Sequence, residues 1–186
     1  MTEDELQDES CLWRPPPPGP YRPTGTVLTL PRRGLEHTLS VFRATAVRRV
    51  EACCFWYGVR DADGGATVLA VVVPKQRNNW GNYFVSSAAV AEMAAVTRPR
   101  GWVNLSQVHT HPGLSVEHSR YDDEQANSRR ALSVVVPFYG RWQGPWPAGL
   151  GVHEFQDDYW HLLSETDASI RVMLADAGDT ELLDLR

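Results

Sequence analysis

Two histidines two positions apart, His109 and His111, end a β-rich stretch of the sequence. Side chains of a strand alternate between its two faces, so both imidazoles are expected on the same face, where two nitrogens can bind one metal ion. Ser119 and Asp122 follow at the start of a predicted helix, and one helical turn brings them close together. Two histidines and an aspartate, with a fourth position left for water, are what a catalytic zinc ion requires.

The same residues also have a purely structural interpretation. A His-x-His pair on a strand is often two polar side chains on a wet face, and Pro112-Gly113 is an ordinary turn signal. Ser119 three positions before Asp122 is typical of a helix start, where the serine caps the helix and the helix dipole favours the acid. The local pattern alone leaves both interpretations open.

The full spacing is more specific than its parts. His-x-His, seven residues and then Ser-x-x-Asp resembles the JAMM motif of the JAB/MPN zinc metalloprotease family. Members of this family also carry a glutamate well upstream, followed by a small residue three positions on and a glycine seven positions on. Glu51, Cys54 and Gly58 match that pattern, with Cys54 where family members more often have glycine. A glutamate at the end of a predicted helix is electrostatically disfavoured, which favours a functional role for it.

The resemblance implies a role for each motif residue. His109, His111 and Asp122 would bind Zn²⁺, and Glu51 would act as the general base for the attacking water. Ser119 would donate a hydrogen bond to the oxyanion. The spacing also selects Asp122 rather than the neighbouring Asp123.

The resemblance further implies a compact prokaryotic member of the family, with a deubiquitinase-like activity and the MPN/JAB (cytidine-deaminase-like) architecture. Such enzymes cleave after the C-terminal tail of a ubiquitin-like protein, so its conjugates and the E1- and E2-like enzymes of the same pathway are the expected partners. Trp80 and Tyr83 lie where the family carries a substrate-gripping insertion and are candidate substrate contacts. Two alternatives stay open: a protease that processes a sulfur-carrier precursor, and a non-catalytic MPN scaffold.

The hydrophobic pattern predicts how these residues are positioned. It favours an α/β fold with a mixed central sheet flanked by helices. Residues 1–25, acidic and then proline-rich, are expected to be a flexible segment, and residues 26–186 one domain. Strands are expected over 26–30, 52–59, 66–74, 102–111, 131–140, 151–155, 159–163 and 169–174, and helices over 35–51, 87–97 and 122–131, followed by a polar tail.

Composition limits the partners and the cellular location expected of the protein. The 186 residues carry a formal charge of −5 and no Lys/Arg-rich run, so nucleic acids and anionic membranes are not expected partners. The apolar runs are too short to span a bilayer, and the acidic N-terminus does not resemble a secretory signal. Three cysteines make a poor disulfide framework, which favours a cytoplasmic location. Cys53 and Cys54 are expected to be buried strand residues rather than nucleophiles.

Overall fold

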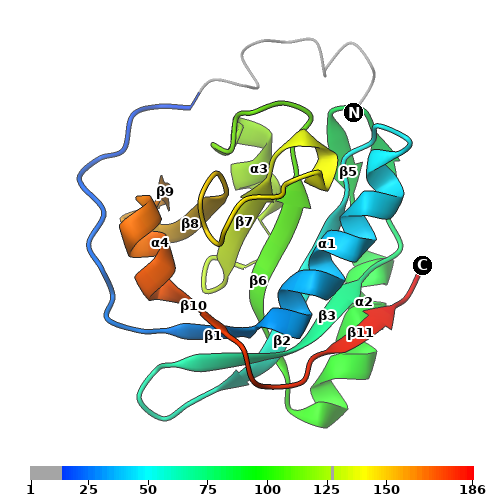
Figure 1. The fold of residues 1–186 in the computed structure, drawn as a ribbon, viewed down its shortest axis with the longest axis horizontal. Helices are drawn as coiled ribbons and strands as arrows, with labels where there is room; N and C mark the ends of the chain where they lie inside the picture. The colour runs from blue at the N-terminus through cyan, green and yellow to red at the C-terminus, as the bar shows by residue number, and fades with distance from the viewer. Residues whose placement is uncertain (1–13, 127) are drawn as a thin grey trace.

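The computed structural model describes residues 14–126 and 128–186, which form a mixed β-sheet with helices packed on it (Figure 1). Nine strands of the described residues make the main sheet, in the order β10-β1-β3-β2-β6-β7-β8-β9, with β11 beside β3; β4 and β5 pair separately. The predicted α/β class is therefore confirmed. No helix in these two ranges is long and apolar enough to cross a lipid bilayer.

The elements have the following bounds. The strands are β1 (Leu28–Pro31), β2 (Cys53–Arg60), β3 (Ala66–Val73), β4 (Arg77–Asn79), β5 (Asn82–Phe84), β6 (Val103–Thr110), β7 (Leu132–Val136), β8 (Gly151–Gln156), β9 (Tyr159–Leu162), β10 (Val172–Ala175) and β11 (Glu181–Asp184). The helices are α1 (Arg32–Ala46), α2 (Ser87–Thr97), α3 (Arg120–Gln125) and α4 (Glu165–Arg171), with single 3-10 turns at η2 (Arg98–Arg100) and η3 (Phe138–Gly140).

Strand β2 lies between β3 and β6 and pairs antiparallel with both. Its side chains alternate between two core clusters. Cys54 and Trp56 pack in the cluster that contains Phe42 of α1, whereas Cys53 and Phe55 pack in the cluster that contains Met93 of α2. Burial on both faces explains why this strand is almost entirely apolar, and it confirms that the two cysteines are buried.

Gly58 stands at an irregular point of the β2–β3 pairing. The pairing register shifts between Tyr57 and Gly58, and a Cβ atom added at position 58 would lie 1.9 Å from the Thr67 carbonyl oxygen. No side chain fits at that distance. The glycine seven positions after Glu51 is therefore explained by strand packing.

Two predicted helix ends are wrong. Helix α1 ends at Ala46, and Arg49 in the following turn has a φ of 53°, a left-handed conformation that stops a helix. Glu51 consequently lies in the extended approach to β2 rather than at a helix end. Helix α3 ends at Gln125 rather than near residue 131, because Ala126 already has extended backbone angles.

The C-terminal part also differs from the prediction. The strand expected over 169–174 is divided between the end of α4 and β10. Ser164 caps α4 by accepting a hydrogen bond from the Asp167 amide at 3.1 Å, and acidic residues in the first turn suit the helix dipole. The expected polar tail contains β11, which pairs parallel with β3 and places Leu183 against the second core cluster.

Part of the N-terminal segment that was expected to be flexible contacts the domain. Residues 1–13 lie outside the described residues, and residues 14–25 run in an extended conformation beside β8 and β9. The Tyr21 hydroxyl donates to Glu154 Oε2 at 2.6 Å. The Gln156 side chain exchanges two hydrogen bonds with the Arg22 backbone.

Candidate metal centre

The end of β6 and the first turn of α3 bring three ligand-type side chains together. The Nε2 atoms of His109 and His111 are 3.2 Å apart. Asp122 Oδ1 lies 3.2 Å from His109 Nε2, and Asp122 Oδ2 lies 3.3 Å from His111 Nε2. The three predicted ligands therefore meet at one point, and this group could hold a metal ion.

The separations are those expected of ligands around one small cation. Nitrogen and oxygen atoms bound tetrahedrally at about 2.0–2.1 Å, as around zinc, are about 3.3 Å apart along each edge of the tetrahedron. The two histidine Nε2 atoms are 3.2 Å apart, and each lies 3.2–3.3 Å from a different carboxylate oxygen of Asp122. The residues present therefore fit a single divalent cation and leave a fourth coordination position open.

Burial and charge set the protonation states that metal binding requires. Burial lowers the pKa of the His109 ring, so this imidazole is neutral at neutral pH. Burial by itself raises the pKa of Asp122, but charge and hydrogen-bond interactions with His109 and His111 outweigh burial and hold that pKa well below its usual range. A neutral imidazole and an ionised carboxylate are the forms that bind metals.

The orientation of His111 is fixed by the backbone. Its Nδ1 lies 3.1 Å from the Ser115 carbonyl oxygen, which can only accept, so Nδ1 carries the proton and Nε2 is left for a metal. His109 is held by packing instead, with its ring centroid 5.3 Å from that of Tyr83. His109 Nδ1 is buried and has no hydrogen-bond partner among the described residues.

Ser119 is the N-cap of α3, as its position in the motif predicted. Its Oγ accepts a hydrogen bond from the Asp122 amide at 3.2 Å, and its own amide donates to Asp122 Oδ2 at 2.7 Å. The Ser119 hydroxyl also donates to Oδ2 at 2.7 Å. The capping interaction therefore fixes the ligand carboxylate. The contact of Ser119 with an oxyanion stays a prediction.

Glu51 lies across the β2–β6 pair from His111. The Thr110 amide donates to the Ala52 carbonyl at 3.0 Å, so the antiparallel alignment continues beyond the last paired residue of β2. The Glu51 side chain is buried, and burial together with the negative charge of Asp122 raises its pKa well above the usual value. A buried carboxyl group with a raised pKa beside a metal group is typical of a catalytic acid or base.

The two predicted substrate contacts lie on the β4–β5 hairpin but differ in exposure. Trp80, at the turn, is 61% exposed. Tyr83 is buried against His109, and its hydroxyl accepts a hydrogen bond from Gln107 Nε2 at 2.5 Å. The structure therefore places Trp80 at the surface and Tyr83 behind the metal group.

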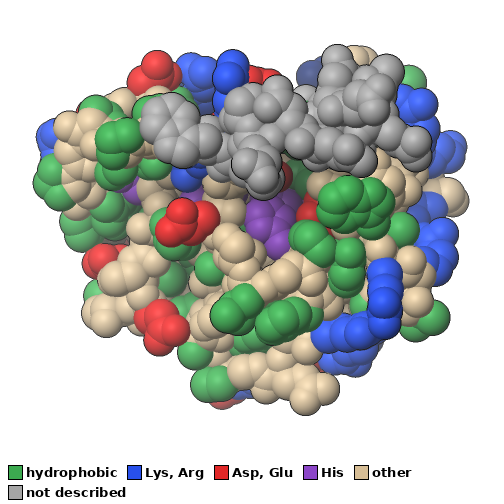
Figure 2. Space-filling model, turned by 90° about the horizontal axis from the view of Figure 1, so that it is seen from above, with side chains coloured by type: hydrophobic (Ala, Val, Ile, Leu, Met, Phe, Trp, Pro, Cys, Tyr) green, Lys and Arg blue, Asp and Glu red, His purple; other side chains and the backbone are tan. Residues whose placement is uncertain are grey.

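The loop after β7 borders the other side of the site. The Tyr139 amide donates to the His111 carbonyl at 2.8 Å, and the Tyr139 hydroxyl donates to the Trp80 carbonyl at 2.9 Å. Phe138 and Tyr139 both have a φ of 55°, a strained conformation of the kind that clusters at functional sites. Phe138 and Leu114 are exposed, and in Figure 2 histidine surface lies among hydrophobic and acidic side chains on this face.

One part of the site had no signal in the sequence. His118, in the loop before Ser119, is buried behind the metal group, where its ring centroid is 5.7 Å from that of His109. It contacts Asp123, and Asp123 in turn contacts Arg14 of the N-terminal segment. The wide sequence separation of Arg14 and Asp123 hides this network from any local pattern.

Comparison with known proteins supports the fold only. No family model matches the chain, and no curated protein matches its sequence. The solution structure of protein DSY2949 from Desulfitobacterium hafniense is similar over 81% of this chain and 94% of that chain, with a TM-score of 0.58 and 21% identity. A protein from Salinibacter ruber (strain DSM 13855) is similar over 73% of this chain and 88% of its own, with a TM-score of 0.54 and 18% identity. The fold is therefore shared, and membership of the JAB/MPN family stays a prediction.

Proposed function

We propose that this protein is a zinc-dependent isopeptidase of the JAB/MPN type, which cleaves after the C-terminal tail of a ubiquitin-like protein. The observation that carries the proposal is the group formed by His109, His111 and Asp122, in which the two Nε2 atoms are 3.2 Å apart and each lies 3.2–3.3 Å from a carboxylate oxygen of Asp122. Two imidazoles and a carboxylate with one open position are typical of zinc hydrolases. The substrate class rests on the resemblance of the complete motif to that family.

The residues of the site have complementary roles in hydrolysis. A zinc ion at this position would polarise a carbonyl group and lower the pKa of water. Glu51 accepts a proton from the attacking water and returns it to the amine nitrogen as the C–N bond breaks, which yields a carboxylic acid and a free amine. Ser119 turns its hydroxyl from Asp122 toward the carbonyl oxygen, where negative charge develops.

The surroundings of the site suit an extended protein tail. Trp80, Leu114 and Phe138 expose apolar surface around it, as protein-binding surfaces do. A cavity of about 410 Å³ is lined by the β4–β5 hairpin and by Tyr121 of α3. An extended chain that lies beside this hairpin could pair with its backbone as an added strand.

The test is a cleavage assay with two substrates. One is a ubiquitin-like protein joined through its C-terminus to a lysine side chain, and the other is the same protein with a linear C-terminal extension. Each is incubated with the purified protein, with and without a zinc chelator, and again after zinc is restored. We expect cleavage directly after the tail, loss of activity with the chelator, and recovery with zinc.

The outcomes separate the three functions. Cleavage of the lysine conjugate supports the isopeptidase. Cleavage of the linear extension alone supports the processing protease. Zinc binding without cleavage of either substrate supports the non-catalytic scaffold, and cleavage that a chelator leaves unchanged contradicts the proposed mechanism.

A further inference from the structure

Arg14 of the N-terminal segment is held firmly against the domain. Its Nε donates to Asp123 Oδ2 at 2.6 Å, and its Nη2 donates to the Trp160 carbonyl at 2.8 Å. The guanidinium also lies over the Tyr159 ring, 4.4 Å from the centroid. Only 10% of the Arg14 side chain is exposed, so the charge is largely desolvated, and Asp123 is the ionised group that it contacts.

Asp123 extends this contact toward the sheet. Its Oδ1 lies 2.9 Å from His118 Nδ1, and His118 Nε2 lies 2.8 Å from the Ser133 hydroxyl on β7. Burial lowers the pKa of His118 well below its usual value, so the neutral ring donates from Nδ1 to the carboxylate and accepts at Nε2 from the hydroxyl. Strand β7 runs parallel to β6, which contains His109 and is followed directly by His111.

The helix held by this network is too short to be rigid by itself. Helix α3 has six residues, and isolated helices of that length are unstable in water. The Ser119 cap fixes Asp122 within its own turn. The contacts of Asp123 with Arg14 and His118 fix that turn relative to the sheet.

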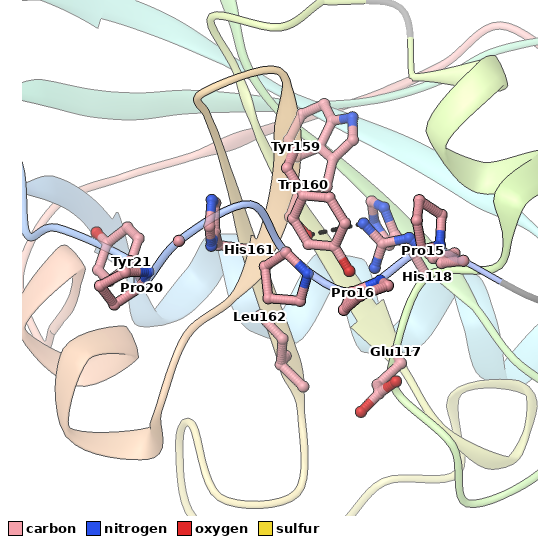
Figure 3. A pocket seen from close by; sticks show the side chains of 13 residues that line it. Pro15, Pro16, Pro20, Tyr21, Glu117, His118, Tyr159, Trp160, His161 and Leu162 are labelled. Atoms are coloured by element: carbon pink, nitrogen blue, oxygen red, sulfur yellow. Dashed lines mark hydrogen bonds between the residues drawn. The ribbon is translucent and has the colours of Figure 1, made fainter.

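The N-terminal segment is attached at separate points rather than along its length. Proline residues lack an amide donor, so Pro15, Pro16 and Pro20 cannot continue a strand ladder beside β9. A cavity of about 550 Å³ lies between the segment and β9, and Figure 3 shows that these prolines, Tyr21 and Tyr159–Leu162 all contribute to its lining. The contacts of Arg14 therefore attach the segment at the end nearest the metal centre.

We propose that Arg14 is a positioning residue of the metal centre, which acts through Asp123 to hold the α3 turn where Asp122 can bind metal together with the two histidines. This proposal rests on the proposed function in one respect, since it requires the three ligands to bind a divalent metal. It gives the proline-rich segment a role in the site rather than that of a spacer.

The test is zinc affinity, measured by competition with a chromophoric chelator for the wild type, Arg14→Ala and Arg22→Ala. Loss of a residue directly behind a ligand typically costs about 10–100-fold in metal affinity, so for Arg14, one contact further away, we expect a loss of about 3–10-fold. Arg22 is the matched control, because it belongs to the same segment and pairs with an exposed acid, Asp157, at 3.0 Å. Exposed pairs contribute little, so Arg22→Ala is expected within about twofold of the wild type.

A second measurement separates positioning from general stability. Cobalt(II) replaces zinc, and the intensity of its visible absorption reports the coordination geometry. We expect Arg14→Ala to alter this spectrum and Arg22→Ala to leave it unchanged. Arg14→Lys keeps the charge and is expected to recover part of the affinity. Asp123→Asn breaks the same link, so the double variant Arg14→Ala/Asp123→Asn should be no weaker than the weaker single variant.

The results distinguish this proposal from the proposed function. A wild-type protein that binds no zinc refutes the metal centre and, with it, the role of Arg14. Normal zinc binding by the wild type together with unchanged affinity and spectrum in Arg14→Ala refutes the positioning role alone. If Arg14→Ala does not fold, Asp123→Asn decides the question, because it breaks the same link, and an affinity and a cobalt spectrum equal to those of the wild type would then refute the positioning role.

Discussion

Replacing Glu51 by glutamine is the sharpest test of the chemistry. The substitution keeps the shape of a buried side chain and removes the group that accepts a proton. General-base catalysis contributes roughly 10²–10⁴-fold to rate. That loss equals about 2.7–5.4 kcal/mol on the barrier. We expect kcat/KM to fall within this range while zinc binding is retained, because Glu51 is not one of the three grouped ligands.

Glu51→Gln should raise the stability of the metal-free protein although it lowers activity. Burial and the charge of Asp122 both raise the pKa of Glu51, so an ionised Glu51 destabilises the metal-free protein at neutral pH. A neutral glutamine removes that cost. In the presence of a chelator, Glu51→Gln is therefore expected to be at least as stable as the wild type. A large loss of activity without a loss of stability would assign the defect to chemistry rather than to folding.

The assay compares Glu51→Gln with Glu117→Gln by conjugate cleavage, zinc content and urea unfolding. Glu117 is an exposed carboxylate close to the start of α3 and serves as the matched control. Its substitution should leave kcat/KM unchanged. If Glu51→Gln retains wild-type kcat/KM at equal zinc content, Glu51 is not the base. If the variant loses zinc instead, Glu51 belongs among the ligands and the assignment of roles is wrong.

Four further predictions concern stability and reactivity. Zinc at about 100 times its Kd should stabilise the protein by about 2.7 kcal/mol. Because each kcal/mol corresponds to roughly 2–4 °C, Tm in a thermal melt should rise by about 5–11 °C. His109→Ala should abolish the shift. Gly58→Ala should destabilise the fold by about 1–3 kcal/mol or more in urea unfolding, because its Cβ would meet the Thr67 carbonyl, whereas Gly81→Ala, with open space around it, should change little. Burial raises the pKa of Cys54 from 9.0 to about 12. With the third cysteine removed by Cys11→Ser, the native protein should not react with a thiol reagent at pH 8. Rapid labelling would contradict the burial of Cys53 and Cys54. The Cys54 thiol ionises at a lower pH in the unfolded chain than in the folded protein, because burial raises its pKa from 9.0 to about 12. The stabilising effect of the protonated thiol on the folded state is therefore complete below pH 9.0, and the free energy of unfolding declines as the pH rises from 9.0 toward 12. Cys54→Ala should remove that decline.

The sequence predicted those features that depend on short-range patterns. Strand periodicity placed His109 and His111 on one face, and motif spacing selected Asp122 rather than Asp123, which agrees with the group in the structure that could hold a metal ion. The strands expected over 52–59 and 66–74 and the helix expected over 87–97 likewise agree with β2, β3 and α2. These features are local because strand faces, caps and turns are each decided within a few residues.

Features that depend on distant contacts were missed. Arg14 and Asp123 are 109 residues apart, and a proline-rich segment gives no periodic signal that it packs against anything. The Ser115 carbonyl that orients His111 belongs to the backbone, so its residue type carries no information. Strand β11 looked like a polar tail because it has only four residues and just one of them, Leu183, is packed in a core cluster.

The two neighbouring acids of α3 show how one short helix can serve both a ligand and its support. Successive residues of a helix point about 100° apart, so Asp122 and Asp123 cannot face the same group. Asp122 faces the two histidines, whereas Asp123 faces His118 and Arg14. The contacts of Asp123 hold α3 in place, because any rotation of α3 that moved Asp122 away from the histidines would also break them. The Asp-Asp pair thus couples the position of the ligand to the docking of the N-terminal segment.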